Sequence, residues 1–128
     1  MKYPQELRYL KTDEWVKVED GIAIIGITDY AQDALSDVVY VEFEIDPDDE
    51  VSAGDSIGTI ESVKAAAEVH FPVSGTVLEV NEEVVDAPEM LNKEPYAGGW
   101  LVKLQVSDES ELDDLMDAAA YEAYCQDR

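Results

Sequence analysis

The chain has 128 residues, 46% of them hydrophobic, and its 31 carboxylates and 8 basic residues give a formal net charge of −23 at pH 7. This length suits one domain with a single core, and the hydrophobic content excludes a disordered acidic tail. The charge argues against nucleic acid or an anionic membrane surface as a partner, and adaptation to salt is one hypothesis that explains it.

Two features bear on where the protein works. The single cysteine, Cys125, excludes an internal disulfide and fits a reducing compartment. No apolar run approaches the roughly 20 residues that span a bilayer. The N-terminal residues show neither an apolar signal core nor an Arg- and Ser-rich leader. We therefore expect a cytoplasmic protein.

Composition and alternating polarity predict short strands along most of the chain. In the first half these are residues 15–18, 22–27 and 38–44. Asp20-Gly21 favours a tight hairpin between the first two strands, because both residue types accept positive φ. The third strand alternates between two faces, one of which carries Val39, Val41 and Phe43, as a half-buried strand does.

The second half continues with strands at residue 51 and at 56–61, 68–73, 76–80 and 100–106. Runs of this length, spaced about 8–12 residues apart, predict an all-β barrel or sandwich rather than βαβ units. Short helical pieces are expected at 28–35, with Thr28 or Asp29 as the N-cap, and as one turn within the loop-like segment 82–92.

The end of the chain changes to a helical period. One apolar stripe is formed by Leu112, Leu115, Met116 and Ala119. Asp108 with Glu111 resembles a capping box, and Asp117 is a candidate cap for a second short helix over residues 118–125. We expect a helical segment over about 108–126 that packs on the β core.

Lys64 is the only lysine or arginine between positions 18 and 92, a stretch with nineteen Asp or Glu. Strands over 56–62 and 67–73 would form a hairpin whose four-residue bend is 63–66. Lys64 would then stand at the tip of the hairpin. On the return strand, Val69, Phe71 and Val73 share one face, which should be buried.

A hydrated lysine at a hairpin tip is a poor catalytic nucleophile, because its pKa falls only with burial or a neighbouring cation. A surface salt bridge to Glu61 or Glu68, worth about 0–1 kcal/mol, is one explanation for Lys64. Covalent attachment of a prosthetic group is the other, since it requires exposure on an ordered platform. The residues by themselves favour the salt bridge.

Five blocks of the sequence together resemble a known family. They are "DEWVKVEDG…GITDYAQDALSD", "AGD…IESVKAA", "PVSG", "PYAGGW" and "LMDAAAYEAY". In their order and spacing they resemble the H-protein of the glycine cleavage system over nearly the whole chain. The resemblance implies a mainly β fold with small helices. Specifically, it implies one lipoyl-carrier domain over residues 1–128, a lipoyl/biotinyl-type barrel-sandwich hybrid with an N-terminal extension and C-terminal helices.

The resemblance also implies the site. Lipoic acid would be joined to Lys64 by an amide, and the lipoate ligase or lipoyltransferase would recognise Glu61, three residues before the lysine, and Gly75, eleven residues after it. The loaded arm carries a cationic amine, and Glu14 is the residue that the family pattern favours for holding it in a cleft that excludes water. A solvated surface acid is the alternative for Glu14.

The implied function is that of a non-catalytic carrier. It would receive the aminomethyl group of glycine from the pyridoxal-phosphate enzyme glycine decarboxylase and deliver it to a tetrahydrofolate-dependent aminomethyltransferase. The reduced arm would then pass to dihydrolipoyl dehydrogenase. A relay protein that donates lipoyl groups to other enzymes would use the same attachment chemistry, so the sequence does not separate these two roles.

Other carriers fit less well. Biotinyl domains usually place methionines beside the lysine, where this chain has Val63 and Ala65, and lipoyl domains of oxo-acid dehydrogenases lack the two terminal extensions. Three positions also depart from the family pattern: Asp13 replaces a histidine, Ser36 replaces a glycine, and His70 stands where an aromatic residue is common. With one histidine and one cysteine, the chain lacks the typical ligands of a transition-metal site.

Overall fold

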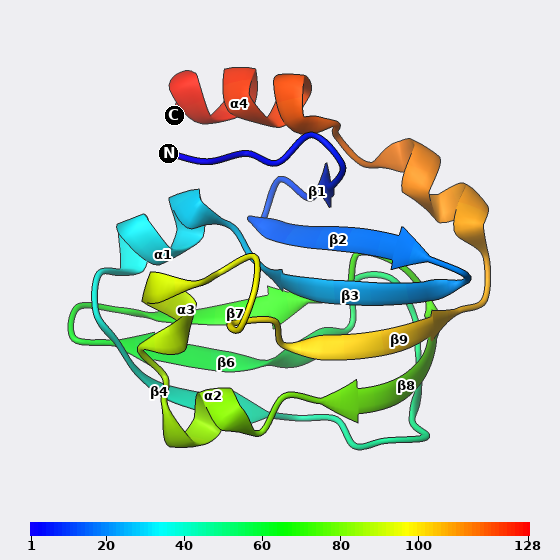
Figure 1. Ribbon diagram of the computed structural model, residues 1–128, viewed down its shortest axis with the longest axis horizontal. Helices are drawn as coiled ribbons and strands as arrows, with labels where there is room; N and C mark the ends of the chain where they lie inside the picture. The colour runs from blue at the N-terminus through cyan, green and yellow to red at the C-terminus, as the bar shows by residue number, and fades with distance from the viewer.

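The computed structural model describes residues 1–128, which form two antiparallel sheets with short helices around them (Figure 1). The larger sheet contains, in spatial order, β1 (Arg8–Tyr9), β2 (Glu14–Glu19), β3 (Ile22–Ile27), β9 (Val102–Val106), β8 (Gly75–Val80) and β5 (Glu50–Val51). The smaller sheet contains β4 (Val38–Phe43), β6 (Ser56–Ser62) and β7 (Ala66–His70). The predicted class, mainly β with small helices in a barrel-sandwich hybrid, is confirmed.

The helices are all short. They are α1 (Asp29–Leu35), α2 (Glu83–Asp86), α3 (Met90–Lys93), a 3₁₀ helix over Glu109–Asp114, and α4 (Ala118–Gln126). Thr28 caps α1, accepting a hydrogen bond from the Ala31 N–H as predicted. The segment 82–92 contains two helical turns, α2 and α3, instead of the one expected. No helix is long and apolar enough to cross a membrane.

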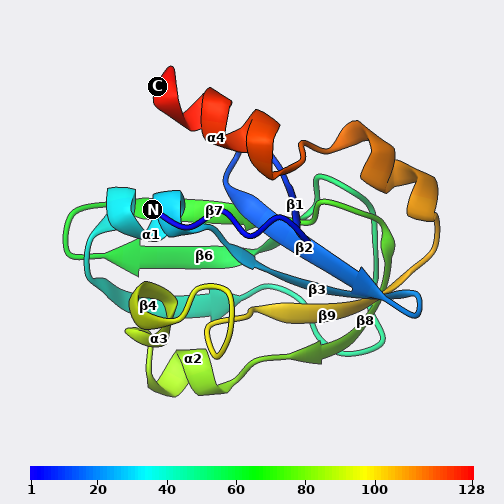
Figure 2. The same cartoon turned by 45° about the horizontal axis from the view of Figure 1, so that its top comes forward.

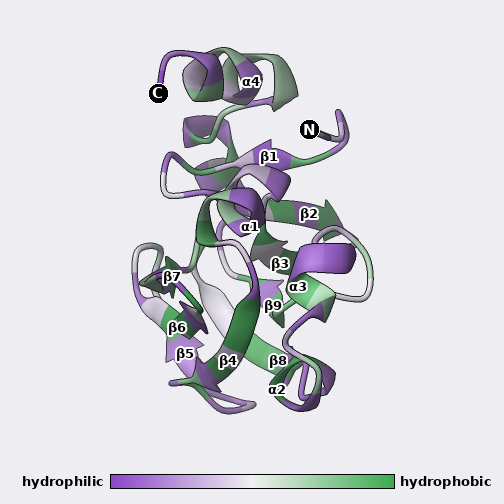
Figure 3. Ribbon diagram, turned by 90° about the vertical axis from the view of Figure 1, so that its left-hand side faces the viewer, coloured by the Kyte–Doolittle hydropathy of each residue, from purple (hydrophilic) through white to green (hydrophobic).

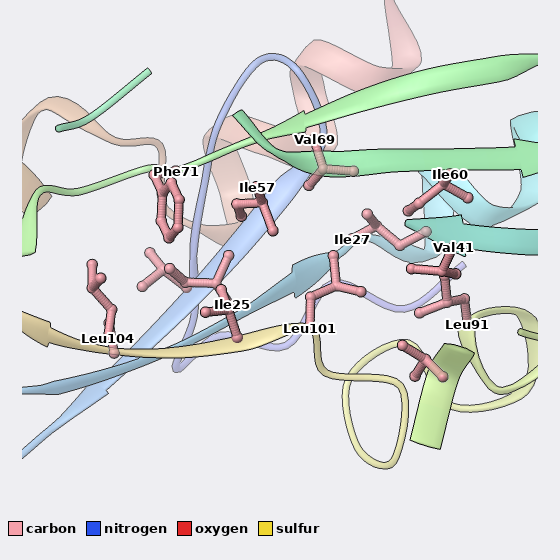
Figure 4. Close-up of a cluster of buried hydrophobic side chains, with 14 of the residues drawn as sticks. Ile25, Ile27, Val41, Ile57, Ile60, Val69, Phe71, Leu91, Leu101 and Leu104 are labelled. Carbon is pink, nitrogen blue, oxygen red and sulfur yellow. The ribbon is translucent and has the colours of Figure 1, made fainter. Parts of the chain in front are cut away.

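The main core lies between the two sheets. Figure 4 shows side chains of β3 and β9, among them Ile25 and Leu104, facing Ile57, Val69 and Phe71 from the opposite side. Val69 is 3% exposed and Phe71 and Val73 are fully buried, as predicted, although the return strand β7 ends at His70 and so does not reach the predicted residue 73. In Figure 3, β4 and β8 carry mostly the hydrophobic colour, whereas the short strands β1 and β5 are largely hydrophilic.

The β2–β3 hairpin forms as predicted. Its turn residues Asp20 and Gly21 have φ of 54° and 78°, and Glu19 pairs with Ile22 across them. Positive φ at both central positions gives the turn the twist that matches the flanking strands.

The predicted alternation of β4 is wrong at its start. Val38 pairs with Ser62 but Tyr40 pairs with Glu61, so Val39 is an extra residue and forms a β-bulge. Because the bulge shifts the pleat, Val38 and Val41 are both buried, whereas Val39 and Tyr40 are both exposed.

The predicted apolar stripe near the C-terminus does not form one helix. Leu112 belongs to a 3₁₀ helix, Leu115 has an extended backbone, and Met116 forms an isolated antiparallel bridge with Tyr9. The physical reason is that the side chains serve different clusters: Leu112 and Leu115 pack on the main core, whereas Met116 packs on a second cluster. The Glu111 carboxylate does not complete a capping box but binds the Ser74 N–H at 2.8 Å and the Ser74 hydroxyl at 2.9 Å.

The second cluster joins the two ends of the chain. It consists of Leu7, Tyr9, Trp15, Ala118, Tyr121 and Cys125. The rings of Tyr9 and Tyr121 stack at 4.6 Å with an interplanar angle of 5°. Helix α4, capped by Asp117 as predicted, therefore packs over β1 and β2 beside the N-terminal segment (Figures 1 and 2).

Candidate functional site

Lys64 lies in the connection between β6 and β7. The connection has three residues, 63–65, instead of the predicted four over 63–66, because β6 continues through Ser62 and β7 already begins at Ala66, which pairs with Glu61. Ser62 organises it: its N–H donates to the Ala65 carbonyl at 2.7 Å, and its hydroxyl accepts from the N–H groups of Lys64 at 3.2 Å and Ala65 at 3.0 Å. The side-chain oxygen thus closes the turn without positive φ.

A second contact ties this turn to the neighbouring strand connection. The Val63 N–H donates to the Asp37 carbonyl at 3.1 Å, just before β4 begins. The turn is therefore held both from within and from β4, and its backbone presents an ordered platform.

The side chain of Lys64 is exposed and forms no ion pair within 4.0 Å. Of its two candidate partners, Glu68 is engaged elsewhere, with its carboxylate 3.1 Å from His70 Nε2. Glu61 is exposed on the last part of β6. The structure therefore leaves the Lys64 amine free to react, and the salt-bridge reading has no contact to support it.

Gly75 lies far from this turn. Figure 1 shows the β6–β7 turn at the left end of the molecule and the beginning of β8 toward the right. Gly75 is buried between β5 and β9, and a Cβ added to it would lie 2.0 Å from the Gln105 carbonyl oxygen. A glycine is required here because two backbones approach each other closely.

Glu14, at the start of β2, is a buried carboxylate rather than a solvated surface acid, with 1% exposure. One oxygen accepts from the Thr12 hydroxyl, and the other accepts from the His70 N–H at 2.7 Å and lies 3.3 Å from His70 Nδ1. The pKa of Glu14 is raised because burial penalises the charged form more than these hydrogen bonds favour it.

The contacts of Glu14 with Thr12 and His70 were not foreseen from the sequence. The alternation of β7 places His70 and Glu68 on one face, which is a signal for their contact, but nothing local indicates that β2 supplies the partner on the other side of the imidazole. The side chain of His70 is 29% exposed, and no group of three or more His, Cys, Asp or Glu side chains is placed to hold a metal ion.

Together these features define a class of protein. The fold packs two β-sheets, and a tight hairpin displays one exposed, unpaired lysine on an ordered backbone. Glu14, the one nearly fully buried carboxylate, lies below the surface on a different sheet. This is the arrangement of a lysine-bearing carrier domain, in which the protein presents an attachment point.

Comparison with known proteins narrows the class. The family described as Glycine cleavage H-protein matches residues 7–128. A glycine cleavage system H protein of Alcanivorax borkumensis is 53% identical over 120 residues, covering 94% of this chain and 93% of that protein. One of Carboxydothermus hydrogenoformans is 50% identical over 119 residues, covering 93% and 91%.

A solved structure agrees. The crystal structure of a glycine cleavage system H protein from Mycobacterium marinum superposes with a TM-score of 0.84 at 34% identity, covering 94% of this chain and 96% of that one. The chain belongs to the glycine cleavage H-protein family.

Proposed function

We propose that Lys64 is the residue to which lipoic acid is attached, through an amide with its side-chain nitrogen. Membership of the family gives the chain the role of the lipoyl carrier in glycine cleavage. The observation that carries the residue assignment is the exposed Lys64 amine, free of any ion pair, at the tip of a turn held by Ser62 and Asp37. Its exposure also fits an acceptor that must enter the active site of an attaching enzyme.

The residues of the turn fit this group. When bound, lipoic acid supplies a redox-active disulfide on a long flexible chain. The protein supplies a fixed attachment point for that chain, because the hydrogen bonds of Ser62 and Val63 hold the backbone on both sides of Lys64.

We infer a non-catalytic carrier, whose partners are glycine decarboxylase, an aminomethyltransferase and dihydrolipoyl dehydrogenase. The single cysteine supports a cytoplasmic location.

Glu61 and Gly75 would contribute to attachment in different ways. Glu61 is exposed and only three residues before Lys64, so a lipoate ligase or lipoyltransferase that reaches the lysine can contact its carboxylate directly. Gly75 is buried at the other end of the hairpin, so its contribution would be indirect: it lets β8 pack on β9 and so keeps the return strand in place.

Glu14 would receive the cationic amine of the glycine-derived group. It offers a carboxylate shielded from water, where an ion pair is stronger than at the surface. Thr12 and His70 already contact its two oxygens, so an incoming amine must take the remaining acceptor site or displace one of these partners. A Glu14→Ala variant should therefore release its cargo to water faster than the wild type. An unchanged lifetime of the loaded carrier would reject this role.

The experiment that tests the function is reconstitution. Lipoylated carrier, glycine decarboxylase and pyridoxal phosphate are mixed, and the exchange of labelled bicarbonate into the glycine carboxyl group is measured. Wild-type carrier should support the exchange, and Lys64→Arg, which keeps the charge but accepts no lipoyl group, should not. Equal exchange with both proteins would contradict the proposal.

A further inference from the structure

Exposed apolar side chains gather beside the attachment turn. The large hydrophobic residues that are exposed in this chain are Met1, Ile22, Val39, Tyr40, Val63, Leu78 and Val85. Three of them, Val39 (53% exposed), Tyr40 (46%) and Val63 (68%), flank Lys64, and we call these three the turn patch. The other four lie on separate elements.

The β-bulge in β4 creates this patch. In a regular strand, Val39 and Tyr40 would point to opposite faces, and one of them would be buried. Because Val39 is an extra residue between the pairs Val38–Ser62 and Tyr40–Glu61, both side chains are exposed directly beside the end of β6. Bulges re-aim side chains in this way next to functional sites. Figure 3 views this end of the molecule and shows β4 in the colour of hydrophobic residues.

The patch is fixed relative to Lys64. The hydrogen bond from the Val63 N–H to the Asp37 carbonyl links the turn to the residues that lead into the bulge. A surface already in its bound shape pays little conformational entropy when a partner docks.

The surroundings of the patch are acidic. Asp37, Glu42 and Glu61 are exposed around it, and Lys64 is the only lysine or arginine between positions 18 and 92. A partner that fits this face presents an apolar contact rimmed by basic side chains, because apolar anchors with complementary charge around them characterise protein interfaces.

We infer that the turn patch is the docking surface for the enzyme that acylates Lys64. This inference rests on the proposed function and adds the residues that this enzyme recognises. The reach of the acceptor decides between partners. A bare lysine is short, so the attaching enzyme must close over the turn and cover Val39, Tyr40 and Val63. Enzymes that later receive the extended arm can engage it while their surfaces stay away from the turn.

The test is acylation of the purified, unmodified protein by a purified lipoate ligase with lipoate and ATP, followed by intact mass. Val39→Ser and Tyr40→Ser should each lower kcat/KM about tenfold, with most of the change in KM. Ile22→Ser and Leu78→Ser are matched controls, because Ile22 (39% exposed) and Leu78 (42%) are comparably exposed on the other sheet. Thermal unfolding of all four variants verifies that they fold.

The outcomes separate this inference from the function beneath it. If wild-type protein is acylated on Lys64 and the patch variants match its kcat/KM, the docking surface is wrong and the proposed function stands. If the control variants lose as much kcat/KM as the patch variants, the effect is not specific to the turn patch and the inferred docking surface is also wrong. If the patch variants are acylated normally but bind glycine decarboxylase more weakly, the patch belongs to that partner and the inference fails. If Lys64 is not acylated at all, both proposals fall.

Discussion

At the scale of single residues, Glu14 is a carboxyl group placed where burial opposes its charge. Its carboxyl group is 1% exposed, and the hydrogen bonds from Thr12 and His70 do not offset the cost of removing the charge from water. In a protein with 31 carboxylates, burying this one destabilises the fold at neutral pH. A cost of that kind is typical of functional sites.

This leads to a prediction about pH. Since the pKa of Glu14 is raised in the folded protein, the folded state holds the proton more tightly than the unfolded state. The stabilisation that Glu14 gives the fold is therefore fully present at low pH, where its carboxyl group is protonated. This stabilisation is lost as pH rises through the raised pKa. Glu14→Gln removes this loss. Chemical denaturation from about pH 4 to pH 8 should show the variant gaining stability over wild type as pH increases.

The control for that measurement is Glu61→Gln, which changes an exposed carboxylate. Its stability should follow the wild type across the same range. Parallel curves for Glu14→Gln and wild type would contradict the account of Glu14.

The sequence predicted the environment of a single residue correctly where that environment is made by residues close to it in the chain. The exposure of Lys64 follows from a hairpin whose strands and bend are consecutive in the chain. The surroundings of Glu14 could not be predicted, because its partner His70 is 56 residues away and comes from the other sheet.

At the scale of elements, the connection from α1 to β4 is under backbone strain. Ser36 has φ 64° and ψ −146°, a conformation that glycine adopts readily and other residues at a cost of about 1–3 kcal/mol. Asn92 holds the connection there: its amide donates to the Ser36 carbonyl at 2.7 Å and its carbonyl accepts from the Val38 N–H at 2.9 Å.

Ser36→Gly should therefore stabilise the protein by about 1 kcal/mol, because relief of strain exceeds the added entropy of the unfolded chain. Ser52→Gly is the control, since Ser52 is exposed and has no positive φ, and it should give no gain. Urea denaturation measures both. A loss of stability in Ser36→Gly would contradict the conclusion that the backbone at Ser36 is strained.

For Gly75 we predict the opposite effect, a loss of stability when the residue is substituted. Because an added Cβ would lie 2.0 Å from the Gln105 carbonyl oxygen, Gly75→Ala must push β8 away from β9. We expect a loss of about 3 kcal/mol in the free energy of unfolding, against little change for the neighbouring Thr76→Ala. If Gly75→Ala kept full stability yet could not be lipoylated, Gly75 would contact the ligase directly and the packing role would be wrong.

Element-scale prediction succeeded for the β2–β3 turn and failed for the segment after residue 107. Asp20-Gly21 specifies its turn by local backbone preference. The stripe of Leu112, Leu115 and Met116 has a helical period, but its members pack on two clusters that only the tertiary fold creates. The bulge at Val39 was missed for the same reason, since it depends on pairing with β6.

At the scale of the whole molecule, repulsion between carboxylates dominates the electrostatics. The net charge is −23, and only three of the 31 carboxylates, those of Asp13, Glu19 and Glu79, pair with a lysine or arginine; two more lie beside His70, which that net charge counts as neutral. Such an excess favours solubility but destabilises the compact state through self-repulsion.

Salt should therefore stabilise the fold by screening. Raising sodium chloride from about 0.05 to 1 M should increase Tm by about 5 °C. Sorbitol at the same osmolality serves as a control, because it does not screen charge and so separates this effect from solvent exclusion. A Tm that does not respond to salt beyond the sorbitol effect would count against the repulsion and against salt adaptation.

The central claim is that the Lys64 side chain is the covalent anchor of the lipoyl group. The most direct measurement is the intact mass of the protein isolated from a cell that makes lipoyl proteins. We predict a mass increased by one lipoyl group, with the increase absent in Lys64→Arg. Wild-type protein without the added mass, or an increase that persists in Lys64→Arg, would contradict the claim.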